Sequence, residues 1–548
     1  MSAANAGYEI RGHKGGKKGG RSIHATRPFI PGDVIARFND PAIVIPLSHH
    51  ALQSCNYCLK RETQIGHGGK LRACTGCKTV AYCGPVCQKA HWTHVHKLEC
   101  KGFQILHKGK PVDRPYWIPT PIRAAAQVML RPQALLQFEG LEGHVEEWRK
   151  KNVTDMKLQA HGVVRCLGLA ITPEKLEDAF RVLCKIQTNA FSSTVEDLEN
   201  GGIFVDTTLA MVNHSCIPNA LVFFDGRTAT LRATGRIAAG QEINISYIDE
   251  TQPKVKRQAA LSSYHFDCAC YKCQHDIDEY QVAMSTYTPE LNHLSVMQDG
   301  DRFKHPPGGG KPDLVQRTEV LRLSSVIPDS PNNLESQAKH AYLRKAYKTG
   351  SYFVKTGKWA LEPFAQVVDD ASFYFAKDRE TPECALAVAC LSAYEAHPFK
   401  HPVPFQNERL EGLCAVALAL SNTAPSPERL VKLARTMAAK KKFPAESVKF
   451  LENLDHVSFC QMVLSLIDAC VTLVSSADWE ILVLAKKMLE DIESLPGREK
   501  ENSLITAWRR SPKEMEGFCK YGLLEPIRKL SELGKAVLEV DLGMDQDL

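Results

Sequence analysis

The stretch Asn213-His214-Ser215-Cys216-Ile217-Pro218-Asn219 offers an amide, an imidazole, a hydroxyl and a thiol in four consecutive residues. These side chains donate and accept hydrogen bonds, and two of them coordinate metals. Pro218 lacks the backbone N–H that a helix needs, and Asn219 suits a tight turn. We therefore expect this stretch to be non-helical and to carry chemistry.

Two later segments also carry residues that point to chemistry. The segment Gly240-Gln241-Glu242-Ile243-Asn244-Ile245-Ser246-Tyr247-Ile248-Asp249 alternates like a strand whose Tyr247 can point toward a pocket. The segment Cys268-x-Cys270-x2-Cys273 places three thiols at the close spacing of zinc ligands. An ordinary loop, a strand and stray cysteines are the alternative, but the order and spacing of the three segments argue against it.

In this order, the patterns NHSCxPN, GxEIxISY and CxCxxC resemble those of SET-type lysine methyltransferases, specifically the SET and MYND domain-containing subfamily. The resemblance implies an α+β multidomain fold: a β-rich SET domain split by a zinc-finger insert and a helical insert, followed by an all-α C-terminal bundle or tetratricopeptide-like domain. It also implies that Cys216 completes a structural zinc site with Cys268, Cys270 and Cys273.

Eight of the cysteines and histidines in residues 55–100 form four closely spaced pairs: Cys55, Cys58, Cys74, Cys77, Cys83, Cys87, His96 and Cys100. Each Zn²⁺ takes four such ligands, so the eight match two ions. A disulfide framework is the alternative, which an intracellular environment disfavours. Together with the set Cys216, Cys268, Cys270 and Cys273, these ligands predict three zinc ions.

The region 55–100 resembles the MYND zinc finger. The resemblance implies interleaved ligation, with Cys55, Cys58, Cys83 and Cys87 on one ion and Cys74, Cys77, His96 and Cys100 on the other. The family usually places two residues between the tryptophan and the ligand histidine, whereas three separate Trp92 from His96 here. His94 is therefore an alternative ligand, and His91 a weaker one.

The resemblance also assigns contacts with S-adenosylmethionine. The glycine-rich start, which ends in Arg21 and Ser22, also comes near a phosphate-binding loop, but Arg21 stands where that loop needs Lys, and prolines follow where it needs a helix. Ser22 replaces a glycine that the family usually keeps. The predicted cofactor-binding residues are Gly19, Gly20, Arg21, His144, Asn213, His214, Tyr264, His265 and Phe266.

Tyr247 is the predicted catalytic residue. A lysine side chain has a free pKa of about 10.4 and must arrive as a neutral amine to attack a methyl group, so an apolar channel would help. By resemblance, the Tyr247 hydroxyl lies where this channel meets the cofactor. Positioning would supply most of the acceleration, up to about 7–11 kcal/mol of the barrier. A buried structural tyrosine is the alternative.

The composition sets outer limits. At 548 residues the chain is long enough for about three domains. With 44% hydrophobic and 24% charged residues, no run of 18 apolar residues and no apolar signal segment at the start, we expect a location in the cytoplasm, the nucleus or both, and no membrane partner. A formal charge of +6 does not by itself imply nucleic-acid binding.

Periodicity predicts the remaining elements. Helical patterns occur around residues 124–130 and 176–184, a hairpin is expected around Asp225-Gly226, and amphipathic helices fill the chain after residue 338. The segment 305–312 looks like a surface loop. Eight further cysteines (Cys166, Cys184, Cys384, Cys390, Cys414, Cys460, Cys470 and Cys519) look like core thiols.

These patterns divide the chain into seven segments. The predicted boundaries are 1–54 for the N-terminal part of the SET domain, 55–100 for the MYND-type zinc finger, 101–200 for the helical insert, 201–250 for the core SET domain, 251–276 for the post-SET zinc segment, 277–337 for a linker or loop region, and 338–548 for the C-terminal helical domain.

The expected function is S-adenosylmethionine-dependent N-methylation of lysines in histone or non-histone proteins. By resemblance, the finger would also bind proline-containing peptides. The alternative function is a zinc-dependent adaptor with weak catalysis that binds partner proteins through the finger and the helical domain. Ser22 and the altered spacing between Trp92 and His96 favour that alternative, whereas Tyr247 and Asn213 argue against it.

Overall fold

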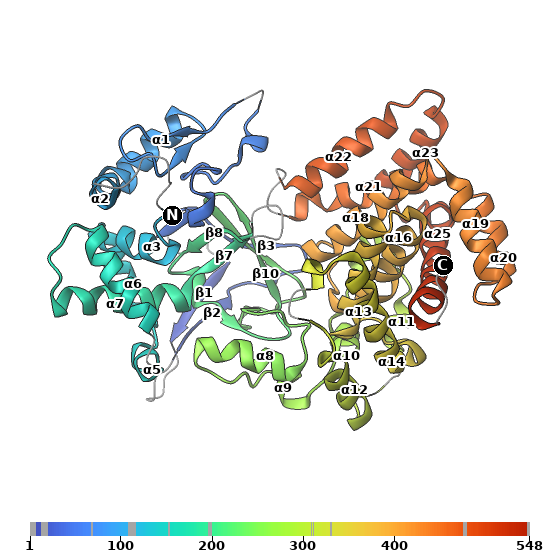
Figure 1. The fold of residues 1–548 in the computed structure, drawn as a ribbon, viewed down its shortest axis with the longest axis horizontal. Helices are drawn as coiled ribbons and strands as arrows, with labels where there is room; N and C mark the ends of the chain where they lie inside the picture. Colours follow the sequence, from blue (N-terminus) through green and yellow to red (C-terminus); the bar gives the residue numbers. More distant parts are fainter. Residues whose placement is uncertain are drawn as a thin grey trace. The chain divides into compact units, whose positions relative to one another are not determined.

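The computed structural model describes residues 7–12, 20–66, 69–107, 117–151, 154–194, 200–307, 310, 312–328, 331–474 and 479–544. The chain forms two compact units. Unit 1 contains Met1–Tyr247 and Gln258–Cys268, and unit 2 contains Ile248–Arg257 and Ala269–Leu548. The strands and the helices that follow them therefore make an α+β multidomain protein, as predicted (Figure 1).

Unit 1 contains five small sheets in its described residues, built from short strands (Figure 1). Their orders are β1-β2, β10-β11-β3, β12-β9, β4-β8-β7 and β5-β6. The strands are β1 (Tyr8–Gly12), β2 (Arg21–Ala25), β3 (Val34–Phe38), β4 (Ile43–Pro46), β5 (Arg72–Ala73), β6 (Ala81–Tyr82), β7 (Phe191–Thr194), β8 (Asn200–Val205), β9 (Asn213–His214), β10 (Ala220–Asp225), β11 (Thr228–Ala233) and β12 (Asn244–Ile245).

The predicted hairpin is confirmed. Strands β10 and β11 pair in antiparallel fashion, with Asp225 opposite Thr228. Gly226 has a φ of 53°, a left-handed conformation that glycine adopts without strain. The stretch 213–219 is likewise non-helical, as expected from Pro218.

The predicted strand over residues 240–249 is shorter than expected. Only Asn244–Ile245 form a strand, because the backbone partners change along the segment. Gly240 has a φ of 81°, the N–H of Ile243 donates to the carbonyl of Ile23 at 2.8 Å, and the N–H of Tyr247 donates to a histidine ring. The segment thus joins several neighbours in turn rather than one strand throughout.

The helical insert of unit 1 agrees with its sequence pattern. Helices α3, α6 and α7 pack together around a core of buried aliphatic side chains (Figure 1). Thr172 caps the N-terminus of helix α7, because its side-chain oxygen accepts from the N–H of Lys175 at 3.3 Å. The helices of this unit are α1 (Pro85–His91), α2 (Lys97–His107), α3 (Thr120–Met129), α4 (Pro132–Glu139), α5 (Val145–Lys150), α6 (Thr154–Cys166) and α7 (Pro173–Asn189).

Unit 2 contains no strand among its described residues. Its helices are α9 (Tyr271–His275), α10 (Glu279–Thr286), α11 (Gly300–Lys304), α12 (Leu314–Ser324), α13 (Ser336–Thr349), α14 (Ser351–Thr356), α15 (Phe364–Phe373), α16 (Pro382–Leu391), α17 (His397–Lys400), α18 (Asn407–Thr423), α19 (Pro427–Ala439), α20 (Ala445–Glu452), α21 (His456–Cys470), α22 (Glu480–Glu493), α23 (Glu499–Arg510), α24 (Glu516–Cys519) and α25 (Glu525–Leu538). Helix α8 (Lys254–Leu261) contributes residues to both units.

Two features of unit 2 refine the sequence expectations. Residues 277–337, which we expected to form a linker or loop region, contain α10, α11 and α12. The stretch His456–Leu473 is long and apolar enough to cross a membrane, but 61% of it is buried in the protein. Helix α21, which makes up most of this stretch, packs against α18 and α22 and belongs to the core of the bundle.

Candidate functional site

The site is built where residues 213–219 meet residues 242–247. Strands β9 and β12 pair in parallel, with Asn244 opposite Asn213 and Ile245 opposite His214. The side chain of Asn219 ties the two segments further, since it accepts from the N–H of Asn244 at 2.8 Å and donates to the carbonyl of Glu242 at 2.9 Å. The patterns NHSCxPN and GxEIxISY are therefore held side by side at this point, which we call the crossing.

Hydrogen bonds orient Asn213 and His214 at this crossing. The Asn213 amide donates to a carboxylate oxygen of Glu242 at 2.8 Å and to the carbonyl of Arg21 at 3.3 Å. Nδ1 of His214 accepts from the N–H of Tyr247 at 3.0 Å, so the neutral ring carries its proton on Nε2. That Nε2 lies 3.3 Å from the sulfur of Cys216. His214 thus links the tyrosine to a predicted zinc ligand.

Tyr247 lies in a cluster of rings. Its ring centroid is 5.1 Å from that of Tyr264, 5.4 Å from that of His214 and 6.5 Å from that of Phe266. Its hydroxyl donates to the carbonyl of Val212 at 2.6 Å. Burial raises the pKa of Tyr247, with smaller electrostatic contributions from Tyr264 and Glu242. The hydroxyl therefore stays protonated and can accept a further hydrogen bond through its lone pairs.

The other predicted cofactor residues lie around this cluster or in a second one. Phe266 contacts the ring of His214 at 6.0 Å between centroids, and Arg21 donates to the carbonyl of Gly140. His144 and His265 face each other at 5.1 Å between centroids. Gly20 directly precedes β2. Gly19 lies outside the described residues.

The second cluster has unsatisfied polar atoms that suit a ligand. His144 and His265 both have left-handed backbones, with φ of 46° and 60°. Trp148 meets His265 edge-on at 4.9 Å between centroids. Within the described chain, Nε2 of His265 and Nε1 of Trp148 are buried and have no hydrogen-bond partner. Buried polar groups normally have partners, so these two atoms fit a bound molecule with polar groups, such as S-adenosylmethionine.

Sequence reasoning missed two residues that position others. Glu242 holds the amide of Asn213, as described above. Asn189 donates to the carbonyl of Glu142 at 2.7 Å and so fixes the turn that leads to His144. Glu242 lies inside the pattern GxEIxISY, but nothing in the spacing of either residue indicates which group it holds.

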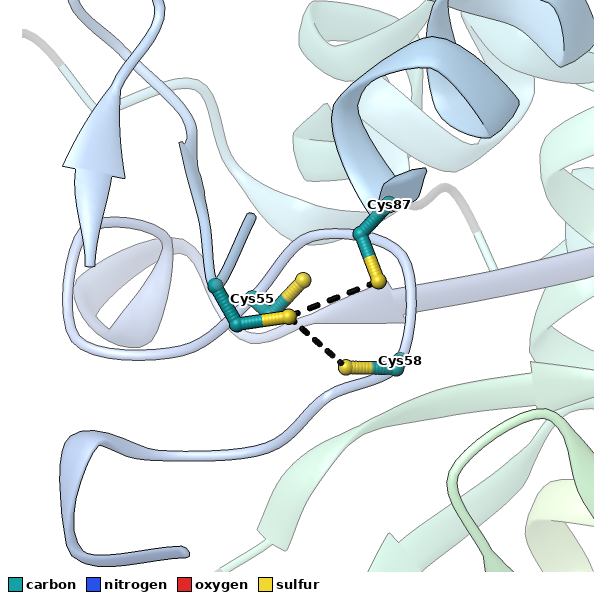
Figure 2. A group of neighbouring side chains, drawn as sticks. Cys55, Cys58 and Cys87 are labelled. Atoms are coloured by element: carbon teal, nitrogen blue, oxygen red, sulfur yellow. Dashed lines mark hydrogen bonds between the residues drawn. The ribbon is translucent and has the colours of Figure 1, made fainter. Parts of the chain in front are cut away.

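The first zinc-ligand group is Cys55, Cys58, Cys83 and Cys87, whose sulfurs lie within 4.8 Å of one another. Figure 2 shows the sulfurs of Cys55, Cys58 and Cys87 pointing toward a common centre. The sulfur of Cys83 is 3.6 Å from that of Cys58 and 3.4 Å from that of Cys87. Only Cys55 is fully buried, so this group lies near the surface of the finger.

The second group is Cys74, Cys77, His96 and Cys100, and all four residues are buried. The Cys74 and Cys100 sulfurs are 3.9 Å apart, and Nε2 of His96 is 3.7 Å from the sulfur of Cys77. His94 points elsewhere, because its Nε2 lies 2.8 Å from the guanidinium of Arg131. The structure thus places His96, rather than His94, among these ligand atoms.

The extra residue between Trp92 and His96 is absorbed by local backbone geometry. Residues Trp92–His96 form a π-helical turn between α1 and α2. A π-turn accommodates one residue more than an α-helical turn, so His96 keeps a ligand position despite the longer spacing. The spacing that favoured the adaptor alternative therefore has a structural explanation.

The third predicted group is Cys216, Cys268, Cys270 and Cys273, of which Cys216 and Cys268 belong to unit 1. The Cys216 and Cys268 sulfurs are 4.0 Å apart. Gln258 holds the backbone of Cys268 on both sides, donating to its carbonyl at 2.9 Å and accepting from its N–H at 3.0 Å. The two groups of the finger each supply the four sulfur or nitrogen ligands of a structural zinc site, and Cys270 and Cys273 would complete the third.

Comparisons with known proteins agree with this geometry. Residues 55–100 match the family model of the MYND finger. The chain is 31% identical over 281 residues to histone-lysine N-methyltransferase ASHR1 of Arabidopsis thaliana, covering 48% of this chain and 56% of that protein. It is 30% identical over 339 residues to N-lysine methyltransferase SMYD2 of Homo sapiens, covering 57% of this chain and 73% of that protein. The chain belongs to the SET and MYND domain family of lysine methyltransferases.

The family assignment confirms the resemblance seen in the sequence. The solved SET domain of LSMT, bound to lysine and AdoHcy, aligns with 92% of this chain and 91% of that chain at 12% identity, but its TM-score of 0.22 is too low to support an argument. This SET and MYND family member spans little more than half the length of ASHR1. The site residues and the boundaries between segments stay predictions.

Proposed function

We propose that this chain transfers a methyl group from S-adenosylmethionine to lysine side chains of proteins. The observation that carries the proposal is the crossing of residues 213–219 with residues 242–247, which holds Tyr247 in a ring cluster beside Asn213 and His214. Membership of a lysine methyltransferase family supports the same reaction. S-adenosylmethionine, when bound, supplies the electrophilic methyl group.

In this proposal the residues of the ring cluster select and orient a neutral amine. Tyr247 cannot act as a general base at neutral pH, because its raised pKa keeps the hydroxyl protonated. Its proton is engaged by the carbonyl of Val212, so its lone pairs face other donors. The rings of Tyr264 and Phe266 line the cluster and make it apolar, which disfavours a lysine ammonium ion.

The cofactor would be held by residues of unit 1. Asn213 and His214 are fixed by Glu242 and by the N–H of Tyr247, which leaves each side chain in one orientation. His265 and Trp148 offer the unsatisfied polar atoms of the second cluster, next to His144. Gly19, Gly20, Arg21, Tyr264 and Phe266 complete the proposed set.

The substrate class and partners are the wider part of the proposal. Histone and non-histone proteins both fit a reaction at an exposed lysine. The finger exposes Val86 (83%) and Trp92 (42%), a surface that suits an extended proline-containing peptide, since such peptides dock against aromatic side chains. Action on such partners would take place in the nucleus, the cytoplasm or both.

The test is transfer of label from radiolabelled S-adenosylmethionine to isolated histones and to a whole-cell protein extract. We expect discrete labelled bands with the wild type and about a 100-fold lower rate with Tyr247→Phe, a loss typical of one polar group in a transition state. Tyr521→Phe, at a tyrosine that is 70% exposed, is the matched control and should keep full activity. An absence of label from zinc-loaded, folded wild-type protein would favour the adaptor alternative.

A further inference from the structure

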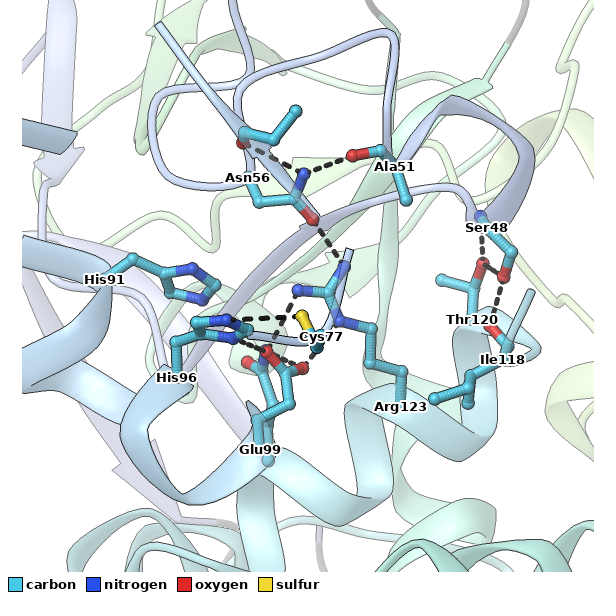
Figure 3. A network of polar contacts seen from close by, with 12 residues as sticks. Ser48, Ala51, Asn56, Cys77, His91, His96, Glu99, Ile118, Thr120 and Arg123 are labelled. Carbon is cyan, nitrogen blue, oxygen red and sulfur yellow. Dashed lines mark hydrogen bonds and ion pairs between the residues drawn. The ribbon is translucent and has the colours of Figure 1, made fainter. Parts of the chain in front are cut away.

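Glu99 connects the second zinc-ligand group to the helical insert (Figure 3). It stands between the ligands His96 and Cys100 in the sequence, and one carboxylate oxygen lies 2.9 Å from Nδ1 of His96. The guanidinium of Arg123, on α3, donates to both carboxylate oxygens at 2.6 and 3.2 Å. Gln127, one turn further along α3, donates to the same carboxylate at 2.9 Å. The ligand histidine is therefore oriented from outside the finger.

Asn56 connects the first zinc-ligand group to the same arginine. Nη1 of Arg123 donates to the side-chain oxygen of Asn56 at 2.7 Å (Figure 3). Asn56 lies between the ligands Cys55 and Cys58, and its amide nitrogen donates to the carbonyl of Ala51 at 2.5 Å. Its backbone N–H donates to the carbonyl of Ala81 at 2.9 Å, just before the ligand Cys83. Arg123 thus contacts the loops that present ligands of both groups.

This network is shielded from solvent. The exposed fraction is 0% for Asn56, 2% for Glu99, 2% for Gln127 and 4% for Arg123. A buried charge without its partner is strongly unfavourable, so the three polar groups around Arg123 depend on one another.

From these contacts we infer that Arg123 is a positioning residue for metal binding, which makes the two zinc ions of the finger bind and leave as one unit. The guanidinium is a planar fork that can reach Glu99 and Asn56 together. A lysine ammonium in its place keeps the charge but cannot hold both partners in this geometry. The inference concerns the finger alone and does not depend on the proposed catalytic activity.

The experiment measures zinc release from the full-length, zinc-loaded chain as the chelator EDTA is increased. Cysteine alkylation and mass spectrometry identify which ligand group has opened at each concentration. In the wild type, Cys83 and Cys87 should become reactive together with Cys74 and Cys77. In Arg123→Lys, the two groups should open at separate EDTA concentrations, and the second group, which contains His96, should open at a concentration about 10- to 100-fold lower than in the wild type, the usual effect of losing a partner that orients a metal ligand.

Two further variants make the result specific. Asn56→Ala removes the contact with the first group only, so the two groups of the finger should open at separate EDTA concentrations. The ligand group around Cys268 should open as in the wild type. Arg232→Lys, at a buried arginine on β11 that donates to the carbonyl of Gly32, is the matched control and should behave like the wild type. Separate opening of the two groups in the wild type, or joint opening of the two groups in Arg123→Lys, would overturn the inference.

Discussion

The finger network is shielded from solvent and the ring cluster around Tyr247 is only partly so, and the two regions treat charge in opposite ways. In the finger, Glu99 is kept ionised despite its burial, because the guanidinium of Arg123 holds its pKa below the usual range and Gln127 donates a further hydrogen bond. In the ring cluster, Tyr247 and Tyr264 are kept neutral because burial raises the pKa of both. Paired charges suit a fixed support for metal ligands, whereas neutral rings suit a site that must receive an uncharged amine.

The largest expected effect is on stability, from Glu99→Ala. Removing this carboxylate leaves the guanidinium of Arg123 buried without its counter-ion, which costs about 3–5 kcal/mol. Urea unfolding of zinc-loaded protein measures the change in the free energy of unfolding. The double variant with methionine at positions 99 and 123 should recover most of the loss. A cost below about 1 kcal/mol for Glu99→Ala would contradict the role of charge pairing in the finger.

The next effect concerns the carboxylate beside the ring cluster. Glu242→Ala frees the amide of Asn213, and the loss of a hydrogen bond to a charged group costs about 1.5–3 kcal/mol. S-adenosylhomocysteine should then bind about 10- to 100-fold more weakly by calorimetry. Glu242→Gln keeps an acceptor and should retain most of the affinity. Equal losses in both variants would show that the charge, rather than the hydrogen bond, matters.

The neutral state of Tyr247 predicts a dependence of stability on alkaline pH. Its pKa is raised in the folded protein, whereas an unfolded tyrosine ionises near pH 10. The folded state then binds more protons than the unfolded state above that pH, so stability falls as pH rises, by up to about 1.4 kcal/mol per pH unit. Urea unfolding from pH 8 to 11 should show a steeper fall in the wild type than in Tyr247→Phe. Parallel curves would contradict a protonated Tyr247.

The smallest expected effect comes from His94→Ala. Burial, with the nearby charges of Arg131 and Arg227, lowers the pKa of His94 to about 4, so this residue is neutral and contributes one ordinary hydrogen bond. Its removal should cost about 1 kcal/mol in urea unfolding and leave the zinc content unchanged. His96→Ala is the contrast and should lose zinc. A fall in zinc content in His94→Ala would show that the two histidines exchange as ligands.

Much of the site could be predicted because its residues are close in sequence. Ligand spacing predicted the two zinc ions of the finger, the family resemblance divided the ligands between them, and the patterns around Asn213 and Tyr247 identified the segments that pair. Contacts between distant residues could not be predicted in this way. Arg123 and Asn56 are 67 positions apart, and no periodic pattern relates them. The length of β12 was overestimated for a similar reason, since the alternation over residues 240–249 is typical of a strand but the backbone partners of this segment lie on different segments.

The placement of the finger ligands has a consequence for synthesis. All eight lie between residues 55 and 100, and Arg123 lies on the next described helix, whereas the ring cluster needs residues as far along as Phe266. Chains fold from the N-terminus as they leave the ribosome, so the finger can bind metal while the segment that carries Tyr247 is still untranslated. A cell short of zinc would therefore impair this protein at the nascent stage, before a methyl-transfer centre exists.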